Sequence, residues 1–235
     1  MKKATITEIQ ERFDNDVERF SNLKTGQVSI VDATLLLELV TESAKRIKPQ
    51  AINLLDIGCG AGNYTLKMLS KLPDLNCTLL DVSRSMLDKA HERVSKEAKG
   101  KVEIIQDDIR NVNLQNDHYD IILAGAVLHH LRDDSDWEFV FDKLFKALAS
   151  GGCFLISDLI KQNTASLDNY FQEKYGNYLE SVGGKAFKTE IFDSIEKQDT
   201  PRSLDYQLEV MKTVGFSHVE ILHKNLCFAA FGGIK

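Results

Sequence analysis

Residues 54–64 read Leu54-Leu55-Asp56-Ile57-Gly58-Cys59-Gly60-Ala61-Gly62-Asn63-Tyr64, and this stretch decides the fold. The apolar run predicts a buried strand, and the alternate glycines predict a tight turn that opens a helix. Such a turn brings backbone N–H groups close to a ligand at the helix N-terminus. The dinucleotide fingerprint G-x-G-x-x-G requires a glycine where Asn63 stands. The carboxylate of Asp56 would repel a pyrophosphate and attract an ammonium or sulfonium group, so the stretch favours a cationic nucleoside.

Strand and helix patterns alternate along the rest of the core. The predicted strands are Ile52–Ile57, Cys77–Asp81, Val102–Ile105, Tyr119–Leu123 and Cys153–Ser157. The predicted helices between them cover Asn63–Leu72, residues 86–98 and, after a capping box at Ser135 and Glu138, residues 137–148. This alternation predicts a parallel sheet with helices on both faces.

The C-terminal part departs from this alternation. A helix over residues 204–211 is followed by Gly215 and by two predicted strands, His218–Leu222 and Cys227–Phe231. The polar connection at residues 223–225 is short, and strands joined by so short a connection must be antiparallel.

Two helices are predicted before the core. A capping box at Thr7 and Gln10 opens an amphipathic helix that carries Phe13 and Phe20 on its apolar face, and a leucine-rich helix follows over residues 30–47. We expect the first helix to close over a bound cofactor. An exposed apolar face on it would instead permit a homodimer.

Residues 161–201 break the strand–helix rhythm and mix aromatic residues with charges of both signs. Ligands of open α/β sheets bind beyond the carboxyl ends of the strands, so we expect a helical cap there with Tyr175 and Tyr178 contacting the substrate. The alternative is a surface insertion whose aromatic residues merely pack on the domain. The whole chain, 1–235, is then one domain made of an N-terminal helical cap (1–50), a cofactor-binding core (51–160), a substrate cap insert (161–201) and a last helix with an antiparallel hairpin (202–235).

Composition excludes several classes of protein. With 29 lysines and arginines against 35 acidic residues, the net charge is −6, which does not favour a nucleic-acid partner. No apolar run approaches the roughly 20 residues of a membrane span, and no signal peptide is expected. The four cysteines lie in or beside predicted strands without metal-ligand spacing, so we expect core residues in a reducing cytoplasm and no metal site.

Acidic residues stand where the second and third strands end. Asp81 follows the glycine turn by about 20 residues, the position from which an acid binds ribose hydroxyls in nucleotide folds. Its neighbours Val82 and Ser83 open the next helix, and Met86 lies one turn further on. After the third strand, a carboxylate of Asp107-Asp108 can accept a hydrogen bond from an adenine amino group while Ile109 covers the ring. Turn-forming or helix-capping acids are the alternative at both positions.

Small residues and two histidines follow the fourth strand. Ala124, Gly125 and Ala126 permit a ligand to approach the backbone closely. His129 and His130 are the residues there suited to act as a general base, and we expect His129 to face the substrate. For either histidine, a place in the core or a capping role is the alternative.

These motifs together resemble the class I S-adenosylmethionine-dependent methyltransferases. Residues 54–64 resemble motif I of that class, residues 123–131 resemble its motif IV, and Gly151-Gly152 and the Gly215-Phe216 ending are similar too. The resemblance runs from about Leu54 to the C-terminus. It implies an α/β fold with a seven-stranded, mostly parallel, doubly wound sheet of order 3-2-1-4-5-7-6 whose last strand is antiparallel.

The resemblance also implies the cofactor and its site. The cofactor would be S-adenosylmethionine, with S-adenosylhomocysteine as product, and Asp108 would be the acid at the adenine. The cofactor-binding residues would be Asp56, Gly58, Cys59, Gly60, Asn63, Asp81, Val82, Ser83, Met86, Asp108, Ile109, Ala124 and Gly125. The expected reaction is methyl transfer to a small-molecule nucleophile.

At finer grain the chain is similar to the carboxy-S-adenosylmethionine synthase family, which serves wobble-uridine modification in tRNA. The likeness lies in the N-terminal helix, the stretch at residues 107–110 and the hairpin ending. That family has an arginine in the last helix to hold the extra carboxylate. By ungapped count this position is Val210, and Arg202 lies two turns earlier. The alternatives to methyl transfer are therefore a carboxy-S-adenosylmethionine-type or tRNA-modification enzyme and a non-catalytic S-adenosylmethionine-binding protein. A third class, the NAD-dependent oxidoreductases, is disfavoured by Asn63 and Asp56.

Overall fold

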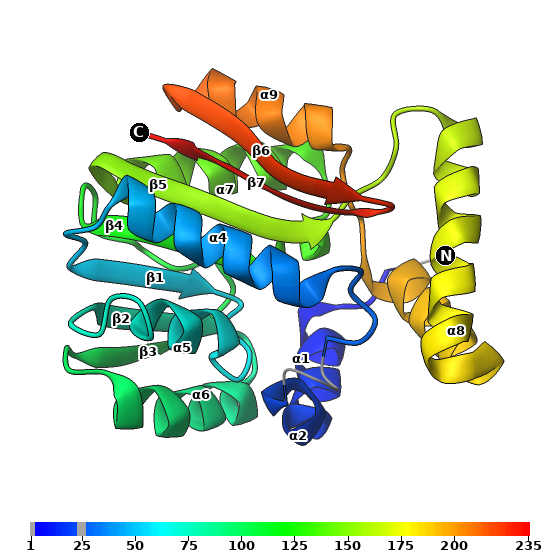
Figure 1. Cartoon of the computed structure of the whole chain (residues 1–235), viewed down its shortest axis with the longest axis horizontal. Coiled ribbons are helices and arrows are strands. Elements are labelled where there is room, and N and C mark those ends of the chain that lie inside the picture. The colour runs from blue at the N-terminus through cyan, green and yellow to red at the C-terminus, as the bar shows by residue number, and fades with distance from the viewer. Residues whose placement is uncertain (1–2, 23–26) are drawn as a thin grey trace.

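The structure, a computed structural model, describes residues 3–22 and 27–235. Within these residues one sheet has the order β3-β2-β1-β4-β5-β7-β6, which confirms the order expected from the sequence (Figure 1). Strands β1 to β5 are parallel, and β7 is antiparallel to both β5 and β6. The strands are β1 (Asn53–Ile57), β2 (Asn76–Asp81), β3 (Val102–Gln106), β4 (Tyr119–Gly125), β5 (Leu148–Leu159), β6 (His218–Asn225) and β7 (Phe228–Ile234).

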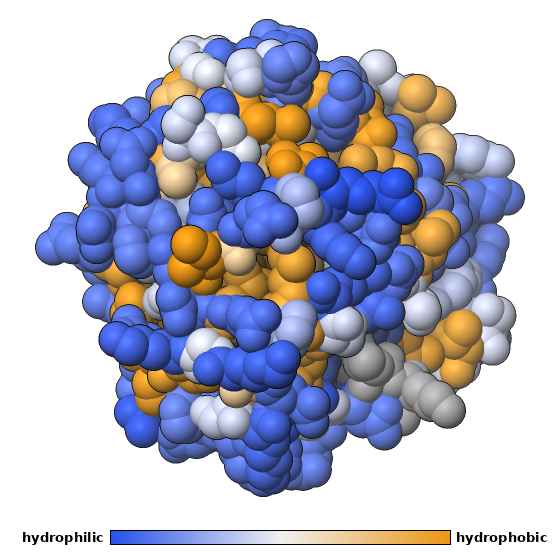
Figure 2. Space-filling model, turned by 60° about the vertical axis from the view of Figure 1, so that its left-hand side comes forward, coloured by the Kyte–Doolittle hydropathy of each residue, from blue (hydrophilic) through white to orange (hydrophobic). Residues whose placement is uncertain are grey.

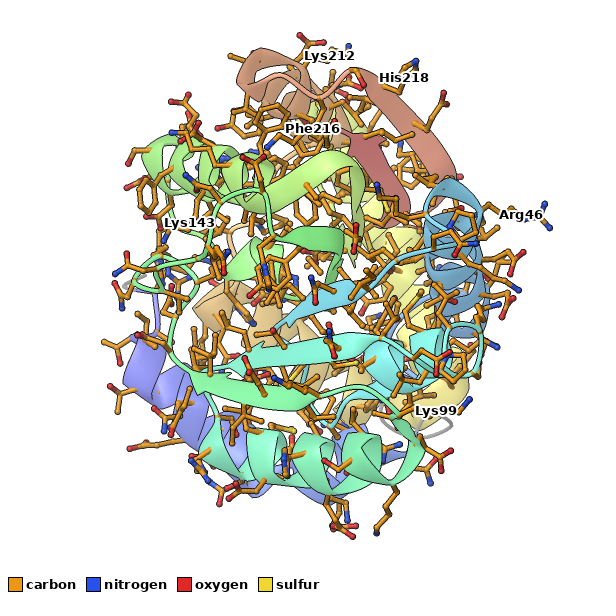
Figure 3. The ribbon with its side chains drawn as sticks, turned by 90° about the vertical axis from the view of Figure 1, so that its left-hand side faces the viewer. Arg46, Lys99, Lys143, Lys212, Phe216 and His218 are labelled. Carbon is orange, nitrogen blue, oxygen red and sulfur yellow. The ribbon has the colours of Figure 1, made fainter. Side chains whose placement is uncertain are left out.

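Helices cover both faces of the sheet. One face carries α4 (Ala33–Ile47), α5 (Asn63–Leu69) and α6 (Arg84–Glu97), and the other carries α7 (Asp134–Ala147) and α9 (Leu204–Val214). Figure 3 shows Arg46 of α4 and Lys143 of α7 on opposite sides of the molecule. Along β1, Leu54 packs in the first core and Leu55 in the second, because successive side chains of a strand point to opposite faces.

The remaining helices lie at the carboxyl ends of the parallel strands. They are α1 (Ile6–Asn15), α2 (Val17–Ser21), the short 3-10 helix η1 (Leu128–His130) and α8 (Ala165–Gln198). The helical character expected of the insert is present, since α8 fills most of it. Gly184 interrupts α8 with a φ of 80°, a backbone angle that suits glycine. Figure 1 shows α8 beyond the carboxyl end of β5.

Three local expectations are corrected by the structure. The β6–β7 turn is formed by Leu226 and Cys227, because β6 continues through residues 223–225. The N-terminal capping box is made by Thr5 and Glu8 rather than by Thr7 and Gln10. The cap of α7 is Asp133, whose side chain accepts from the backbone N–H of Asp136, so the expected pair at residues 135 and 138 is not the cap.

None of the described helices is long and apolar enough to cross a membrane. Figure 2 shows a face that is mostly hydrophilic, with apolar residues gathered in small groups.

Candidate functional site

A cavity of about 170 Å³ opens where β1, β2 and β4 end. Its position agrees with the rule that ligands of open α/β sheets bind beyond the carboxyl ends of the strands. Of the expected cofactor-binding residues, those in its wall are Asp56, Gly58, Cys59, Gly60, Asn63, Asp81, Val82, Met86, Asp108, Ile109 and Gly125. Ser83 and Ala124 are not in the wall.

The glycine turn forms the floor of the cavity with left-handed backbone angles. Gly58 has a φ of 60°, and a Cβ there would lie 2.4 Å from Cγ2 of Val127. Gly60 has a φ of 50°, and no described atom lies within 4 Å of the position its Cβ would occupy. The first glycine is therefore required by packing, and the second keeps the backbone open toward the cavity.

Asp81 fixes this turn. Its Oδ2 accepts from the backbone N–H of Gly60 at 2.8 Å, and its Oδ1 accepts from the backbone N–H of Ser83 at 2.9 Å. The side chain is 8% exposed, and burial raises its pKa. Each carboxylate oxygen has a second lone pair for a ligand hydroxyl. Ser83 itself caps α6 through Met86 and contacts Asp14 of α1, which explains its place outside the wall.

Asp56 is a buried carboxyl group at the end of β1. Its Oδ2 accepts from the hydroxyl of Thr65 at 2.6 Å. Burial has the largest effect and raises the pKa of Asp56 to about 7, although the hydrogen bond from Thr65 acts to lower it. A cation bound in the cavity would stabilise the ionised form, so this group can couple ligand binding to proton release.

Asp108 is held by an arginine two residues on. Oδ1 and Oδ2 of Asp108 accept from Arg110 at 2.8 and 2.7 Å, and Arg110 also donates to Asp136 at 2.7 Å. Burial opposes ionisation, but the hydrogen bonds and charge of Arg110 outweigh it and lower the pKa of Asp108. Lys143 of α7, labelled in Figure 3, donates to the carbonyl groups of residues 109, 110 and 112 and so fixes this loop.

Side chains of the N-terminal helices close one side of the cavity. Ile6, Ile9 and Phe13 of α1 and Phe20 of α2 are in its wall. Phe13 and Phe20 also contact each other, with ring centroids 5.4 Å apart. These four apolar side chains thus contribute to the cavity wall. Gln27 and Ile30 are also in the wall. Neither was expected from the sequence, because Gln27 lies between the two predicted helices and Ile30 begins the second, and no motif marks either position.

The N-terminal helix is also attached to the end of α8. Lys3 donates to the carbonyl groups of Glu196 and Asp199, and the backbone N–H of Ala4 donates to Lys197 at 2.8 Å. Arg12 of α1 donates to Gln198. The docking of α1 over the cavity thus depends on residues 196–199.

Tyr175 and Tyr178 are packing residues, which corrects the expectation that they contact a substrate. Their hydroxyls donate to the carbonyl groups of Ser29 and Val28 at 2.8 and 2.9 Å. Tyr175 is 1% exposed, and its ring contacts Phe228 of β7. Neither tyrosine is in the cavity wall, because both join α8 to the segment before α4.

The expectation that His129 faces the substrate is corrected by the structure, which places the other histidine of η1, His130, at the cavity. His130 is in the cavity wall, whereas His129 lies behind it with its Nδ1 against Oδ1 of Asp158. Burial alone would lower the pKa of His129, but the carboxylates of Asp158 and Asp199 outweigh burial and raise it to about 9. Burial, together with the charge of His129, lowers the pKa of His130.

These histidines and Asp199 form a compact cluster. One donor atom from each lies within 4.8 Å of the others, a separation that a metal ion can span, although sequence spacing had given no reason to expect a metal site. The raised pKa of His129 favours a proton at its ring nitrogens, and a proton there competes with a metal ion.

Comparisons with known proteins match this geometry. A family model described as a methyltransferase domain matches residues 54–152. The chain is 27% identical over 231 residues to a carboxy-S-adenosyl-L-methionine synthase from Campylobacter hominis, a match that covers 94% of this chain and 97% of that protein.

Two solved structures share the fold. DhpI in complex with S-adenosylhomocysteine has a TM-score of 0.62 at 16% identity, over 97% of this chain and 95% of that one. Human N-acetylserotonin methyltransferase in complex with S-adenosylmethionine has a TM-score of 0.62 at 14% identity, over 98% of this chain and 59% of that one.

The sheet order and the acids around the glycine turn are those of an enzyme that takes a methyl group from S-adenosylmethionine. With the domain match over residues 54–152, they identify a class I S-adenosylmethionine-dependent methyltransferase domain in this chain.

The ionisation of Asp56 predicts a pH-dependent cofactor affinity. Because its pKa is about 7 and a cationic nucleoside favours the carboxylate, the affinity for S-adenosylmethionine should fall about tenfold for each pH unit below 7. Calorimetric titrations between pH 5.5 and 8 measure this. In Asp56→Asn the affinity should be weaker and independent of pH over that range. A constant affinity in the unaltered chain would show that Asp56 does not couple to the cofactor.

Proposed function

We propose that this chain transfers a methyl group from S-adenosylmethionine to a small-molecule acceptor, with His130 rather than His129 facing that acceptor. The observation that carries the proposal is the make-up of the cavity. Polar groups for a nucleoside lie along the strand ends, and apolar side chains of α1 and α2 cover them. A macromolecular acceptor would have to displace these helices to reach the site.

The residues of the cavity suit the chemistry of the cofactor. Bound S-adenosylmethionine supplies a methyl group made electrophilic by its sulfonium. The chain has to bind the nucleoside, orient an acceptor and exclude water, and orientation alone removes on the order of 7 kcal/mol of the barrier in favourable cases. Asp81 and Asp108 would hold the ribose and the adenine. Ile6, Ile9 and Phe13 would keep water from the methyl group.

Two positions argue against synthesis of a carboxylated cofactor. Val210 is 7% exposed and packs in the core beneath α9, and Arg202 of the α8–α9 connection donates to Asp134 at 2.9 Å. The described residues of the cavity wall include one arginine, Arg110. It already forms ion pairs with Asp108 and Asp136. An additional ligand carboxylate would find no unpaired guanidinium among these groups, so we favour methyl transfer.

A thermal-shift titration tests the proposed cofactor. At about 100 times its Kd a ligand stabilises a protein by roughly 2.7 kcal/mol, and for a chain of this size the Tm rises by on the order of 5–10 °C. We expect that rise with S-adenosylmethionine and with S-adenosylhomocysteine, and no rise with NAD, which serves as the matched control. A rise with NAD alone would contradict both the cofactor and the interpretation of the glycine turn.

A further inference from the structure

Lys143 of α7 binds the backbone of the loop that follows β3. Its ammonium group donates to the carbonyl oxygens of Ile109 and Arg110, both at 2.8 Å, and to that of Val112 at 3.0 Å. An ammonium group has three N–H donors, so one loop uses all of them. Any effect of Lys143 on a bound nucleoside must therefore act through this loop.

Two of these carbonyl groups belong to peptide units that also hold Asp108. In a trans peptide unit the C=O and the N–H lie in one plane and point in opposite directions. The unit that begins with the carbonyl group of Ile109 ends with the N–H of Arg110, which donates to Oδ1 of Asp108 at 2.8 Å. The next unit ends with the N–H of Asn111, which donates to the carbonyl oxygen of Asp108 at 2.8 Å. By fixing both carbonyl groups, Lys143 orients both N–H groups toward Asp108.

A second residue of α7 binds the same loop. Asp136 lies about two helical turns before Lys143, so both side chains are on one face of the helix. Asp136 accepts from the guanidinium group of Arg110 at 2.7 Å, and that group also donates to both carboxylate oxygens of Asp108. Helix α7 thus holds Arg110 by its side chain and by its backbone, and Arg110 in turn holds Asp108.

These contacts leave one acceptor position on Asp108 for a ligand. Its Oδ1 accepts from the backbone N–H and from Nε of Arg110, whereas its Oδ2 accepts one hydrogen bond, at 2.7 Å. A carboxylate oxygen accepts about two, so Oδ2 keeps one lone pair that no described group occupies. The side chain of Asp108 is in the cavity wall and is 12% exposed, so a ligand can reach it.

The charge of Asp108 decides what kind of group can bind there. Burial opposes ionisation, but the hydrogen bonds and charge of Arg110 and the charge of Lys143 lower the pKa of Asp108. An ionised carboxylate accepts hydrogen bonds and donates none. The open position therefore favours an amino group on a ligand and repels a carbonyl oxygen.

We propose that Lys143 is a positioning residue that determines which nucleobase the cavity accepts. It orients Asp108 toward the exocyclic amino group of adenine, and it thereby excludes hypoxanthine, which has a carbonyl oxygen in place of that group. This inference rests on the proposed function, in which Asp108 holds the adenine of S-adenosylmethionine. A site built to bind a hydrogen-bond donor rejects an analogue that lacks the donor, because the acceptor in the site is then left unpaired.

Isothermal titration calorimetry of the whole chain with two nucleosides tests this proposal. S-adenosylhomocysteine has the amino group, and S-inosylhomocysteine has the carbonyl oxygen. The unaltered chain should bind the first roughly 10–100-fold more tightly, the usual effect of a hydrogen bond to a charged group. In Lys143→Met the Kd of S-adenosylhomocysteine should rise about tenfold, whereas the Kd of S-inosylhomocysteine should change little. Most of the preference for adenine is then lost.

Two further variants make the result specific. Lys146→Met removes an exposed lysine of the same helix, which pairs with Asp142, and should leave both Kd values unchanged. Lys143→Arg keeps the positive charge but spreads its donors over a planar group, so it cannot bind the three carbonyl groups from one nitrogen atom. Its preference for adenine should lie between those of the unaltered chain and of Lys143→Met.

Similar Kd values for the two nucleosides in the unaltered chain would contradict the inference. So would equal losses of affinity for both nucleosides in a folded Lys143→Met, because a merely structural role predicts that result. If Lys143→Met does not fold, an unchanged preference in Lys143→Arg contradicts the inference in its place. Failure of both nucleosides to bind the unaltered chain would instead contradict the proposed function.

Discussion

Replacement of Asp81 with alanine should weaken the binding of S-adenosylmethionine by about 10²–10⁴-fold. In our proposal Asp81 accepts hydrogen bonds from two ribose hydroxyls, and a hydrogen bond to a charged group contributes about 1.5–3 kcal/mol. The same carboxylate holds the backbone of Gly60 and Ser83, so its loss also loosens the turn that approaches the cofactor. Isothermal titration calorimetry measures the change in Kd.

Two further variants make this result specific. Asp81→Asn keeps one carbonyl oxygen as an acceptor, so its loss of affinity should lie between those of the unaltered chain and the alanine variant. Asp88→Ala removes an exposed acid from the neighbouring helix α6, where Asp88 pairs with Arg84, and should leave the Kd unchanged. A loss below fivefold in a folded Asp81→Ala would show that this acid does not bind the ribose.

Replacement of Asp158 with alanine should lower the free energy of unfolding by about 3–5 kcal/mol, the usual effect of leaving one partner of a buried ion pair alone. Asp158 is 1% exposed. Its oxygens accept from the backbone N–H groups of Leu128 at 2.8 Å and of Leu159 at 2.7 Å, and they face the ring of His129. Urea denaturation monitored by circular dichroism measures the change.

The same pair predicts how stability depends on pH. The pKa of His129 is about 9 in the folded chain and about 6.5 in an unfolded one, so the folded state binds more protons between these values. The stabilisation is complete below pH 6.5 and is lost as the pH rises through 9, at up to about 1.4 kcal/mol per pH unit. Measurement from pH 6.5 to 8 avoids the range in which unfolded cysteines ionise.

The double variant His129→Phe/Asp158→Ala is the control for both effects. It removes the buried charge together with its partner, so it should recover part of the stability lost in Asp158→Ala. Between pH 6.5 and 8 it should lose the larger part of the pH dependence, which comes from His129, and keep the smaller decrease that Asp56 contributes as its carboxyl group ionises near pH 7. If the unaltered chain shows the same pH profile as the double variant, His129 is not an imidazolium in the folded state.

The sheet could be predicted from the sequence because its strands carry strong local signals. Each buried strand is a short apolar run closed by glycine or an acid, and the carboxyl ends of parallel strands meet at one edge. That is why Asp56, Asp81 and Asp108, far apart in the chain, were expected together and lie in one cavity wall.

The positions of the histidines and tyrosines could not be predicted in this way. In a 3-10 helix successive side chains differ by about 120° around the axis, so the phase of η1 decides whether His129 or His130 faces the cavity. That phase depends on Asp158, which anchors the backbone of the turn. Tyr175 and Tyr178 lie on a helix whose direction changes at Gly184, and their burial follows from the docking of that helix onto residues 28 and 29.

The position of the β6–β7 turn was not predicted, for a different reason. Turn rules favour glycine and polar residues, and those rules selected residues 223–225. The structure places the turn at Leu226, whose φ of 50° is uncommon for a side chain of that kind. The pairing of β6 with β7 continues to Asn225 and Phe228 and imposes this angle.

The attachment of α1 to residues 196–199 sets an order of events during synthesis. Ala4 pairs with Lys197, so nearly two hundred residues must be added before α1 meets its partner. At about 5–20 residues per second, the ribosome takes on the order of 10–40 s to do so. The nucleoside-binding strands can assemble in that interval, whereas the wall that α1 contributes cannot. A nascent chain therefore presents an open cleft, and the enzyme acquires its enclosed reaction chamber only after residues 196–199 have been synthesised.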